Sequence, residues 1–345
     1  MSTKHRLSLL TPLVDGDLSA YVAAELGHAD ALDAFFENGD VLTRAVAPEK
    51  ILHIVSGNTP EAGKQSLVRG LLLGSHNFVK LPSAGLPEFE AFVEQLPAEL
   101  KSLVECHREL PEEWLDEANA VIVFGSDETI HHFREKIAPN QKFIAHGHAV
   151  SFGVVLEANA EAAKLAARDV SLYDQKGCLS PHCIYVKGDA KAFAGRLAEA
   201  MAAFENHTPR SKLSTEEEAQ IFHLRSGYRF RAASDPSVEM WESEDSSAWT
   251  VLYEEETQFA LSILNRFVFV KPLPEDLATE IWLIADHLSS IAVYPFDRTT
   301  AESFTHLGAT RICALGKSQE PPLGWSQDGT STLADLVTWQ SIDRI

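Results

Sequence analysis

Residues 51–60 read Ile-Leu-His-Ile-Val-Ser-Gly-Asn-Thr-Pro, a short apolar run rich in β-branched side chains that closes in turn residues. This pattern predicts a buried strand that enters a tight turn. Apolar side chains recur at near-helical spacing through residues 61–73, and Gly74 supplies a helix stop. The stretch therefore predicts a strand, a turn and a helix in succession.

The same alternation extends along the chain from this stretch. We expect further strands at residues 77–81, 101–105, 120–124, 142–146, 151–156, 183–187, 249–253, 266–270, 291–294 and 311–315. We expect helices at residues 87–95, 112–119, 127–137, 161–171, 190–205, 276–289, 301–307 and 332–339. Strands that alternate with helices at this spacing imply right-handed crossovers and mostly parallel sheets covered on both faces. We therefore predict an α/β fold.

Two segments lie outside this alternation. Residues 7–13 are a short apolar run, which we predict to be a strand or an edge segment, and the polar residues 232–247 are predicted to be an exposed loop. The 345 residues suffice for about two domains. We predict domains at 1–160 and 161–320, followed by a C-terminal helix within 321–345.

Charge and composition narrow the classes of function. The sequence holds 29 Lys and Arg against 50 Asp and Glu, a formal net charge of −21. Such an excess of carboxylates repels phosphates, so we expect no nucleic-acid or anionic-membrane partner. No apolar stretch approaches the ~20 residues of a membrane span, and four cysteines are too few for a disulfide scaffold. We therefore expect a reduced, cytoplasmic protein without a leader sequence.

Cys178 is the first candidate for chemistry. Gly177 precedes it and a Ser-Pro pair follows closely, at a predicted junction between a helix and a strand, where a turn can expose a thiol to a cleft. Most cysteines that form no disulfide are small buried hydrophobes, so the residue alone leaves both interpretations open. The other three cysteines lie in or beside apolar runs and are predicted to pack in the core. Cys178, His182 and Cys183 are too loosely spaced for a zinc site, and we predict no metal.

Histidines form the other polar clusters. His146 and His148 follow a predicted strand and invite acid–base chemistry, whereas His131 and His132 fit a solvated helix face. The sequence lacks Gly-x-Gly-x-x-Gly, a Walker-type Gly-Lys-Ser/Thr and Gly-x-Ser-x-Gly at strand-to-helix turns. Ordinary Rossmann binding, P-loop binding and serine hydrolysis are therefore not supported.

Several short motifs occur in a recognisable order. They are SGNTP at 56–60, FVKLPS at 78–83, FGSDET at 124–129, GHAVSFG at 147–153 and YDQKGCLSP at 173–181, with further pieces at 264–270 and 308–313. Taken together, this order resembles the aldehyde dehydrogenase superfamily, and within it the acyl-CoA reductases of the LuxC type. The resemblance runs from about residue 50 to the end, and it implies an NAD(P)-binding domain followed by a domain that carries the catalytic cysteine.

The resemblance implies how a cofactor is held. Lys80 would bind the adenosine ribose, and Gly125 and Ser126 would lie by the pyrophosphate. Members that prefer NAD often carry Glu three residues after that lysine, where this chain has Ser83. A carboxylate accepts the ribose hydroxyl but repels a 2′-phosphate, so its absence favours NADPH over NADH.

The resemblance also implies the reaction. Cys178 would attack an acyl thioester of coenzyme A or of an acyl carrier, and hydride transfer to the acyl-enzyme would yield an aldehyde. The side-chain amide of Asn58 and the backbone N–H of Cys178 would stabilise the oxyanion. Hydrolytic members carry a Glu base about thirty residues before the cysteine, but here 143–148 read Phe-Ile-Ala-His-Gly-His. Transfer between thiols is therefore favoured over hydrolysis. His146 or His148 would handle the proton, unless the histidine only caps or packs the turn.

Two other readings of the same residues remain. A catalytically silent relative would bind nucleotide or acyl carrier, and retained Asn58, Lys80 and Cys178 argue against it; the missing Glu argues against an oxidising aldehyde dehydrogenase. The arginines 225, 229 and 231 would meet cofactor phosphates or stay solvated. The chain has a short N-terminal part compared with luciferase-linked members, so we do not predict assembly with the partners of luminescence. A homo-oligomer stays open.

Overall fold

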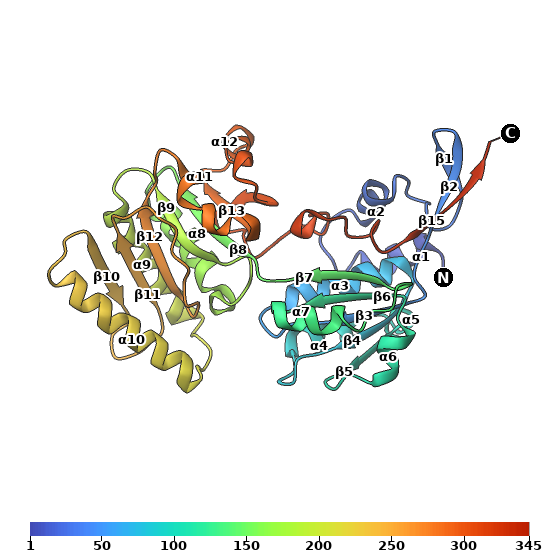
Figure 1. Cartoon of the computed structure of the whole chain (residues 1–345), viewed down its shortest axis with the longest axis horizontal. Helices are drawn as coiled ribbons and strands as arrows, with labels where there is room; N and C mark the ends of the chain where they lie inside the picture. Colours follow the sequence, from blue (N-terminus) through green and yellow to red (C-terminus); the bar gives the residue numbers. More distant parts are fainter. Residues whose placement is uncertain (345) are drawn as a thin grey trace. The chain divides into compact units, whose positions relative to one another are not determined.

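The computed structural model describes residues 1–344. The chain divides into two compact units, one of Met1–His148 together with the segment from Pro322 onward, and one of Ala149–Pro321. Our boundary at residue 160 falls at the first residue of a helix of the second unit, and the C-terminal segment belongs to the first unit. Each unit has its own mostly parallel sheet (Figure 1). The predicted α/β class is therefore confirmed.

The first unit is built on a five-stranded parallel sheet in the order β5-β4-β3-β6-β7. Its strands are β3 (Lys50–Ile54), β4 (His76–Lys80), β5 (Val104–His107), β6 (Ala120–Phe124) and β7 (Lys142–His146). Its crossover helices are α3 (Pro60–Leu73), α4 (Pro87–Gln95), α5 (Ala98–Lys101), α6 (Glu112–Glu117) and α7 (Asp127–Arg134). The chain runs from β3 outward to β5 and returns to β6 on the other side of β3.

Both faces of this sheet are buried, as the apolar runs predict. On β3, Ile51 packs in a cluster with Leu67 and Leu71 of α3. Its neighbour Leu52 points to the opposite face and packs in a cluster with Trp114 of α6. Successive side chains of a strand alternate between faces, so one apolar run supplies two cores.

The second unit is built on a seven-stranded sheet in the order β10-β11-β12-β9-β8-β13-β14. Its strands are β8 (Val150–Val155), β9 (Pro181–Val186), β10 (Val238–Glu242), β11 (Thr250–Glu254), β12 (Phe267–Pro272), β13 (Leu288–Tyr294) and β14 (Arg311–Ala314). Only the edge strand β10 is antiparallel to its neighbour. Its helices are α8 (Ala160–Ser171), α9 (Ala190–His207), α10 (Thr215–Ala232), α11 (Leu277–Glu280) and α12 (Arg298–Ser303).

A small antiparallel sheet completes the first unit. It joins β1 (Phe36–Asn38), β2 (Val41–Val46) and β15 (Thr338–Asp343) in the order β1-β2-β15. Figure 1 shows the red β15 running beside the blue β2, from opposite ends of the sequence. None of the helices within residues 1–344 combines the length and apolar character that a bilayer crossing requires.

Both terminal predictions were wrong. Residues 7–13 were predicted as a strand or an edge segment, but α1 (Thr3–Leu10) is a helix whose N-cap Ser2 accepts a hydrogen bond from the His5 backbone N–H. A short apolar run does not distinguish a strand from a helix. The helix predicted at 332–339 is absent, and the strand β15 begins at Thr338 instead. Its partner β2 is remote in the sequence, so local propensity was overridden by pairing.

Two internal predictions were also wrong. Residues 232–247 contain β10, because the apolar Val238 and Met240 face the core and the strand pairs with β11. The helix predicted at 276–289 is found only in part, as the single α-helical turn α11, which ends at Glu280, and a 3₁₀ segment at Trp282–His287; β13 already begins at Leu288. In residues 232–247, the alternation of apolar and polar side chains along β10 covers only five residues, which is too short to predict a strand within a polar segment.

Candidate active site

Polar candidates of the first unit lie at one edge of its sheet. All five strands are parallel, so their carboxyl ends share an edge. Asn58 is exposed in the turn between β3 and α3, and Gly125 lies in the turn between β6 and α7. Since β3 and β6 are neighbours whose connections leave in opposite directions, these turns flank the topological switch point, where open α/β sheets bind ligands. Lys80 and His146 end the adjoining strands β4 and β7.

The turn after β6 is tightly built. Ser126 is the N-cap of α7, and its Oγ accepts a hydrogen bond from the Thr129 backbone N–H at 3.3 Å. A Cβ at Gly125 would lie 3.0 Å from the Thr129 Cβ, closer than ordinary contact. A glycine therefore lets the backbone pass close to the helix start. Asp127 and Glu128 stand in the first turn of α7, where carboxylates complement the helix dipole.

Lys80 and Ser83 remain accessible. Within residues 1–344 the Lys80 ammonium has no carboxylate partner, and its side chain is half-buried at the end of β4. Ser83 follows in an exposed turn. A cation without a carboxylate partner, followed three residues later by a small exposed hydroxyl, is chemically compatible with a phosphate-bearing ligand.

The two histidines differ in their surroundings. The ring of His146 is buried and stacks on Phe124, with centroids 4.6 Å apart at 20°. Its Nδ1 lies 2.6 Å from Oδ2 of Asp328, a residue of the C-terminal segment with a left-handed backbone (φ 54°). His148 is exposed. A proton on Nδ1 shared with Asp328 leaves Nε2 as the acceptor of His146. Nothing in the local sequence pointed to Asp328, because it lies far from His146 in the chain.

Cys178 lies in the second unit at the amino end of β9. It is exposed, in the loop between a short 3₁₀ segment (Leu172–Gln175) and Pro181. Its backbone carbonyl accepts a hydrogen bond from Ser151 Oγ of β8 at 2.9 Å. The cysteine loop is therefore tied to the neighbouring strand.

The other cysteines are poor nucleophiles. Burial raises the pKa of the Cys183 thiol to about 12 and that of Cys313 to about 11. Burial, with a smaller contribution from the nearby Glu90 carboxylate, raises the pKa of Cys106 to about 11. Thiols with such pKa values stay protonated near neutral pH, and the thiolate is the nucleophile. Their predicted packing roles agree with these environments.

Two three-residue stretches of the second unit have a left-handed backbone conformation, and the first of them directly precedes the cysteine loop. Tyr173, Asp174 and Gln175 have φ of 53°, 54° and 64°, and Leu264, Asn265 and Arg266 have φ of 64°, 57° and 61°. This conformation costs about 1–2 kcal/mol for each residue that is not glycine, so the surroundings must hold it.

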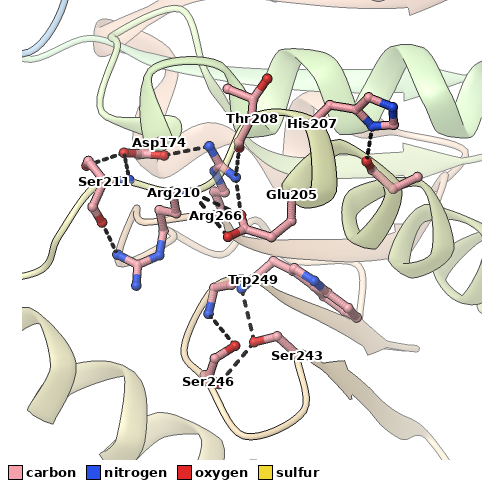
Figure 2. Close-up of polar contacts among 12 residues, drawn as sticks. Asp174, Glu205, His207, Thr208, Arg210, Ser211, Ser243, Ser246, Trp249 and Arg266 are labelled. Carbon is pink, nitrogen blue, oxygen red and sulfur yellow. Dashed lines mark hydrogen bonds and ion pairs between the residues drawn. The ribbon is translucent and has the colours of Figure 1, made fainter.

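An ion-pair network joins the two turns. Asp174 lies 2.8 Å from the Arg266 guanidinium, which also pairs with Glu205 of α9 at 2.5 Å (Figure 2). Asp174 Oδ2 further accepts hydrogen bonds from the backbone N–H and the hydroxyl of Ser211. Both stretches belong to motifs that carried the resemblance, but sequence reasoning did not link them.

His182 and the arginines of α10 make contacts within the second unit, and Arg229 and Arg231 remain exposed, with 52% and 47% of their side chains accessible, as one of the two interpretations of these arginines predicts. Burial lowers the pKa of His182 to about 4, and its Nδ1 accepts the Ser262 backbone N–H at 3.1 Å. Within residues 1–344, no group of three or more His, Cys, Asp or Glu side chains could hold a metal. Arg225 is buried and pairs with Glu242 at 3.2 Å. Arg229 pairs with the same carboxylate and Arg231 pairs with Glu254. These arginines join α10 to the β10–β11 pair.

The candidate residues thus fall into two groups. The first unit holds those at its sheet edge and in the following turns: Asn58, Lys80, Ser83, Gly125, Ser126, His146 and His148. The second unit holds Cys178 with its supporting turns. The first group offers a cation, helix N-termini and a paired histidine, and the second offers an exposed thiol.

Comparisons with known proteins point to one family. A family model described as acyl-CoA reductase (LuxC) matches residues 5–339. The long-chain acyl-protein thioester reductase of Vibrio harveyi is 25% identical, covering 94% of this chain and 70% of that protein. The enzyme of the same name from Aliivibrio fischeri is 22% identical, covering 93% of this chain and 69% of that protein.

Solved structures show the same fold. Aldehyde dehydrogenase 21 of Physcomitrella patens superposes with a TM-score of 0.67 at 12% identity, covering 99% of this chain and 86% of that chain. An NAD-dependent benzaldehyde dehydrogenase of Corynebacterium glutamicum superposes with a TM-score of 0.60 at 14% identity, covering 90% of this chain and 72% of that chain.

Proposed function

Because this chain belongs to the LuxC family of acyl-CoA reductases, which has the aldehyde dehydrogenase fold, we propose that it reduces a fatty acyl thioester to the aldehyde with NADPH through an acyl-enzyme on Cys178. Family membership makes it an acyl thioester reductase, and hence an oxidoreductase. The observation that carries the mechanism is the contrast among cysteines. Cys178 is exposed on a loop that is held from several sides, whereas burial raises the pKa values of the other three thiols.

The acyl-enzyme forms by exchange of one thioester for another. The thiolate of Cys178 attacks the carbonyl carbon, the bond from that carbon to the donor sulfur breaks, and the donor leaves as a thiol. The backbone N–H of Cys178 stabilises the oxyanion, and the resemblance assigns the second donor to Asn58. Removal of one such donor typically lowers the rate about 10²–10³-fold.

Reduction then releases the aldehyde. When bound, NADPH would supply the hydride that reduces the thioester carbonyl carbon, leaving a thiohemiacetal oxyanion on Cys178. As this oxyanion collapses, the carbon–sulfur bond breaks, the aldehyde leaves and the Cys178 thiolate is restored. We assign the proton transfers to His146, because Asp328 holds its Nδ1 and leaves Nε2 to accept. His148 lies exposed in the following turn and is left out of the mechanism.

The residues of the first sheet edge fit NADPH. Lys80 has an unpaired cation within the described chain, and Ser83 brings no carboxylate that would repel a 2′-phosphate. The N-terminus of α7, which begins directly after Gly125 and Ser126, offers backbone N–H groups to a pyrophosphate. Lys80 and Ser83 are therefore assigned to the ribose phosphate, and Gly125 and Ser126 to the pyrophosphate.

The donor of the acyl group is proposed to be either a coenzyme A thioester or an acylated protein. The family description names acyl-CoA, whereas the curated relatives are named for acyl-protein thioesters. Both donors present the same thioester to Cys178, so one experiment with two arms separates them.

The test is the intact mass of the protein after incubation with acyl donors in the absence of nicotinamide, with peptide mapping. Butanoyl-, octanoyl- and hexadecanoyl-CoA form one arm, and hexadecanoyl-carrier protein forms the other. We expect an acyl adduct on Cys178 that is lost in Cys178→Ala and kept in the matched control Cys106→Ala. No adduct on reduced Cys178 in either arm, or an adduct that persists in Cys178→Ala, would refute the mechanism.

A further inference from the structure

We propose that Gln175 is a positioning residue that holds the cysteine loop in its reactive shape. This inference rests on the proposed acyl-enzyme at Cys178. The side chain of Gln175 is fully buried, and its Nε2 donates a hydrogen bond to the Pro181 carbonyl at 2.8 Å. Gln175 precedes Cys178 and Pro181 follows it, so this hydrogen bond spans the loop that carries the thiol, outside the tighter turn in which the Ser180 N–H donates to the Gly177 carbonyl at 2.9 Å.

The acceptor half of the same amide ties the loop to the sheet. Gln175 Oε1 accepts a hydrogen bond from the Phe267 backbone N–H at 2.8 Å and from Ser262 Oγ at 3.3 Å. Phe267 is the first residue of β12, which lies next to β9. The amide therefore sets both the width of the loop and its distance from the strand beside it.

Contacts on either side limit how the loop can relax. Asp174 pairs with Arg266, and Lys176 pairs with Glu217 at 2.7 Å. Figure 2 shows Arg266 between Asp174 and Glu205. With its neighbours held, a change at Gln175 is transmitted to the backbone of residues 177–180, which includes the N–H proposed to stabilise the oxyanion. A displacement of about 1 Å in reacting groups can cost about 100-fold in rate.

The bonds require a side chain that donates and accepts at once. Met has similar volume but offers neither group, so Gln175→Met leaves the Pro181 carbonyl and the Phe267 N–H without this partner. Glu has the same shape, and when protonated it can donate to Pro181 and accept from Phe267. Ionised Glu cannot donate, so Gln175→Glu is expected to work in acid and to fail as the carboxyl ionises.

The experiment compares two reactions of the same thiol. The rate of acylation of Cys178 by hexadecanoyl-CoA needs an aligned loop, whereas the rate of alkylation by iodoacetamide needs only an accessible thiolate. We expect acylation of Gln175→Met to fall about 100-fold, with alkylation close to wild type. We expect acylation of Gln175→Glu to approach wild type in mildly acid buffer and to fall relative to wild type as the pH rises.

Gln141 in the first unit supplies a matched control. Its Nε2 donates to the Leu115 and Ala118 carbonyls at 2.6 and 2.7 Å, and its Oε1 accepts the Ala138 N–H at 2.8 Å. Gln141→Met and Gln141→Glu remove the same kinds of bond and should leave the acylation rate unchanged.

The outcomes separate this inference from the proposed function. If wild-type Cys178 forms no acyl adduct, the proposed function fails. If wild type is acylated and both Gln175 variants keep its rate across the pH range, Gln175 has no positioning role. A Gln175→Met variant that loses acylation and alkylation equally would show loss of the fold around the loop, and would overturn the inference unless Gln175→Glu shows the expected pH dependence.

Discussion

The ring of His146 is held on two sides, by stacking on Phe124 and by its contact with Asp328. Burial restricts which way the ring can turn, and the carboxylate decides which nitrogen carries the proton. An acid–base histidine needs both constraints, because the nitrogen that faces the substrate must be free to accept. At the residue scale, Asp328 is therefore the residue that would set the tautomer in the role proposed for His146, one of the two histidines that the sequence offered.

We predict that Asp328→Asn lowers turnover of the acyl thioester about 10–100-fold, since an amide can donate to Nδ1 and hold the wrong tautomer. Steady-state NADPH oxidation checks this. Asp335→Asn makes the same change at an exposed site of the same segment and should keep wild-type turnover. If Asp328→Asn keeps full turnover while His146→Ala is inactive, Asp328 does not set the tautomer.

At the scale of elements, α3 packs on its sheet through a buried polar cluster. His53 of β3 contacts Ser66 of α3 at 2.7 Å and Asn77 of β4 at 3.0 Å. The helix approaches so closely at Gly70 that a Cβ there would lie 1.8 Å from Asn77 Oδ1. The glycine therefore allows the contact between His53 and Asn77 beneath the helix that follows the Asn58 turn.

We predict that Gly70→Ala destabilises the protein by about 1–3 kcal/mol, because the methyl group displaces Asn77 from His53. Gly227 of α10 is a helical glycine where an added Cβ would meet no atom within 4 Å, so Gly227→Ala should stabilise by about 0.5–1 kcal/mol. Urea unfolding of both variants measures the two effects. Equal effects of the two substitutions would contradict the role of Gly70.

For the whole molecule, each unit contains a buried histidine that is neutral in the folded state. Burial lowers the pKa of His53 in the first unit and of His182 in the second to about 4. Both histidines titrate near 6.5 in the unfolded chain. The unfolded state therefore binds more protons between pH 6.5 and 4, and stability falls as the pH falls through this range.

Asp169 opposes this trend in the second unit, because burial raises its pKa to about 6. Between pH 6 and 3.8 the folded state binds the extra proton, so this carboxyl adds stability as the pH falls. In the second unit, Asp169 therefore partly offsets the stability that is lost when His182 is protonated. In the first unit, none of the described carboxyl groups is found with a raised pKa that would offset the stability lost through His53.

We predict that the free energy of unfolding is highest above pH 6.5 and falls toward pH 4, with His53 contributing on the order of 2 kcal/mol to the fall. Urea titrations across this range test it. His53→Gln should show a shallower fall than wild type, while His131→Gln, on an exposed helix face, should follow wild type. Identical slopes for wild type and His53→Gln would disprove the assignment.

Local sequence was sufficient for the elements that lead to the site. The apolar run at 51–56 and its turn predicted β3, the Asn58 turn and α3, since a buried parallel strand needs only apolar residues and a turn signal. The order of short motifs predicted the family, which the family model confirms. The resemblance supplied Cys178, and the structure leaves it exposed.

Other features depend on pairs of residues that are distant in the chain. The pairing of β15 with β2, the contact of Asp328 with His146, and the bond of Gln175 to Phe267 all belong to this class. A local sequence pattern indicates which residues can form a pair, but it does not identify the partner. The partner is determined by how whole helices and strands pack against each other. The supporting residues of the candidate site are therefore visible only once the chain is folded.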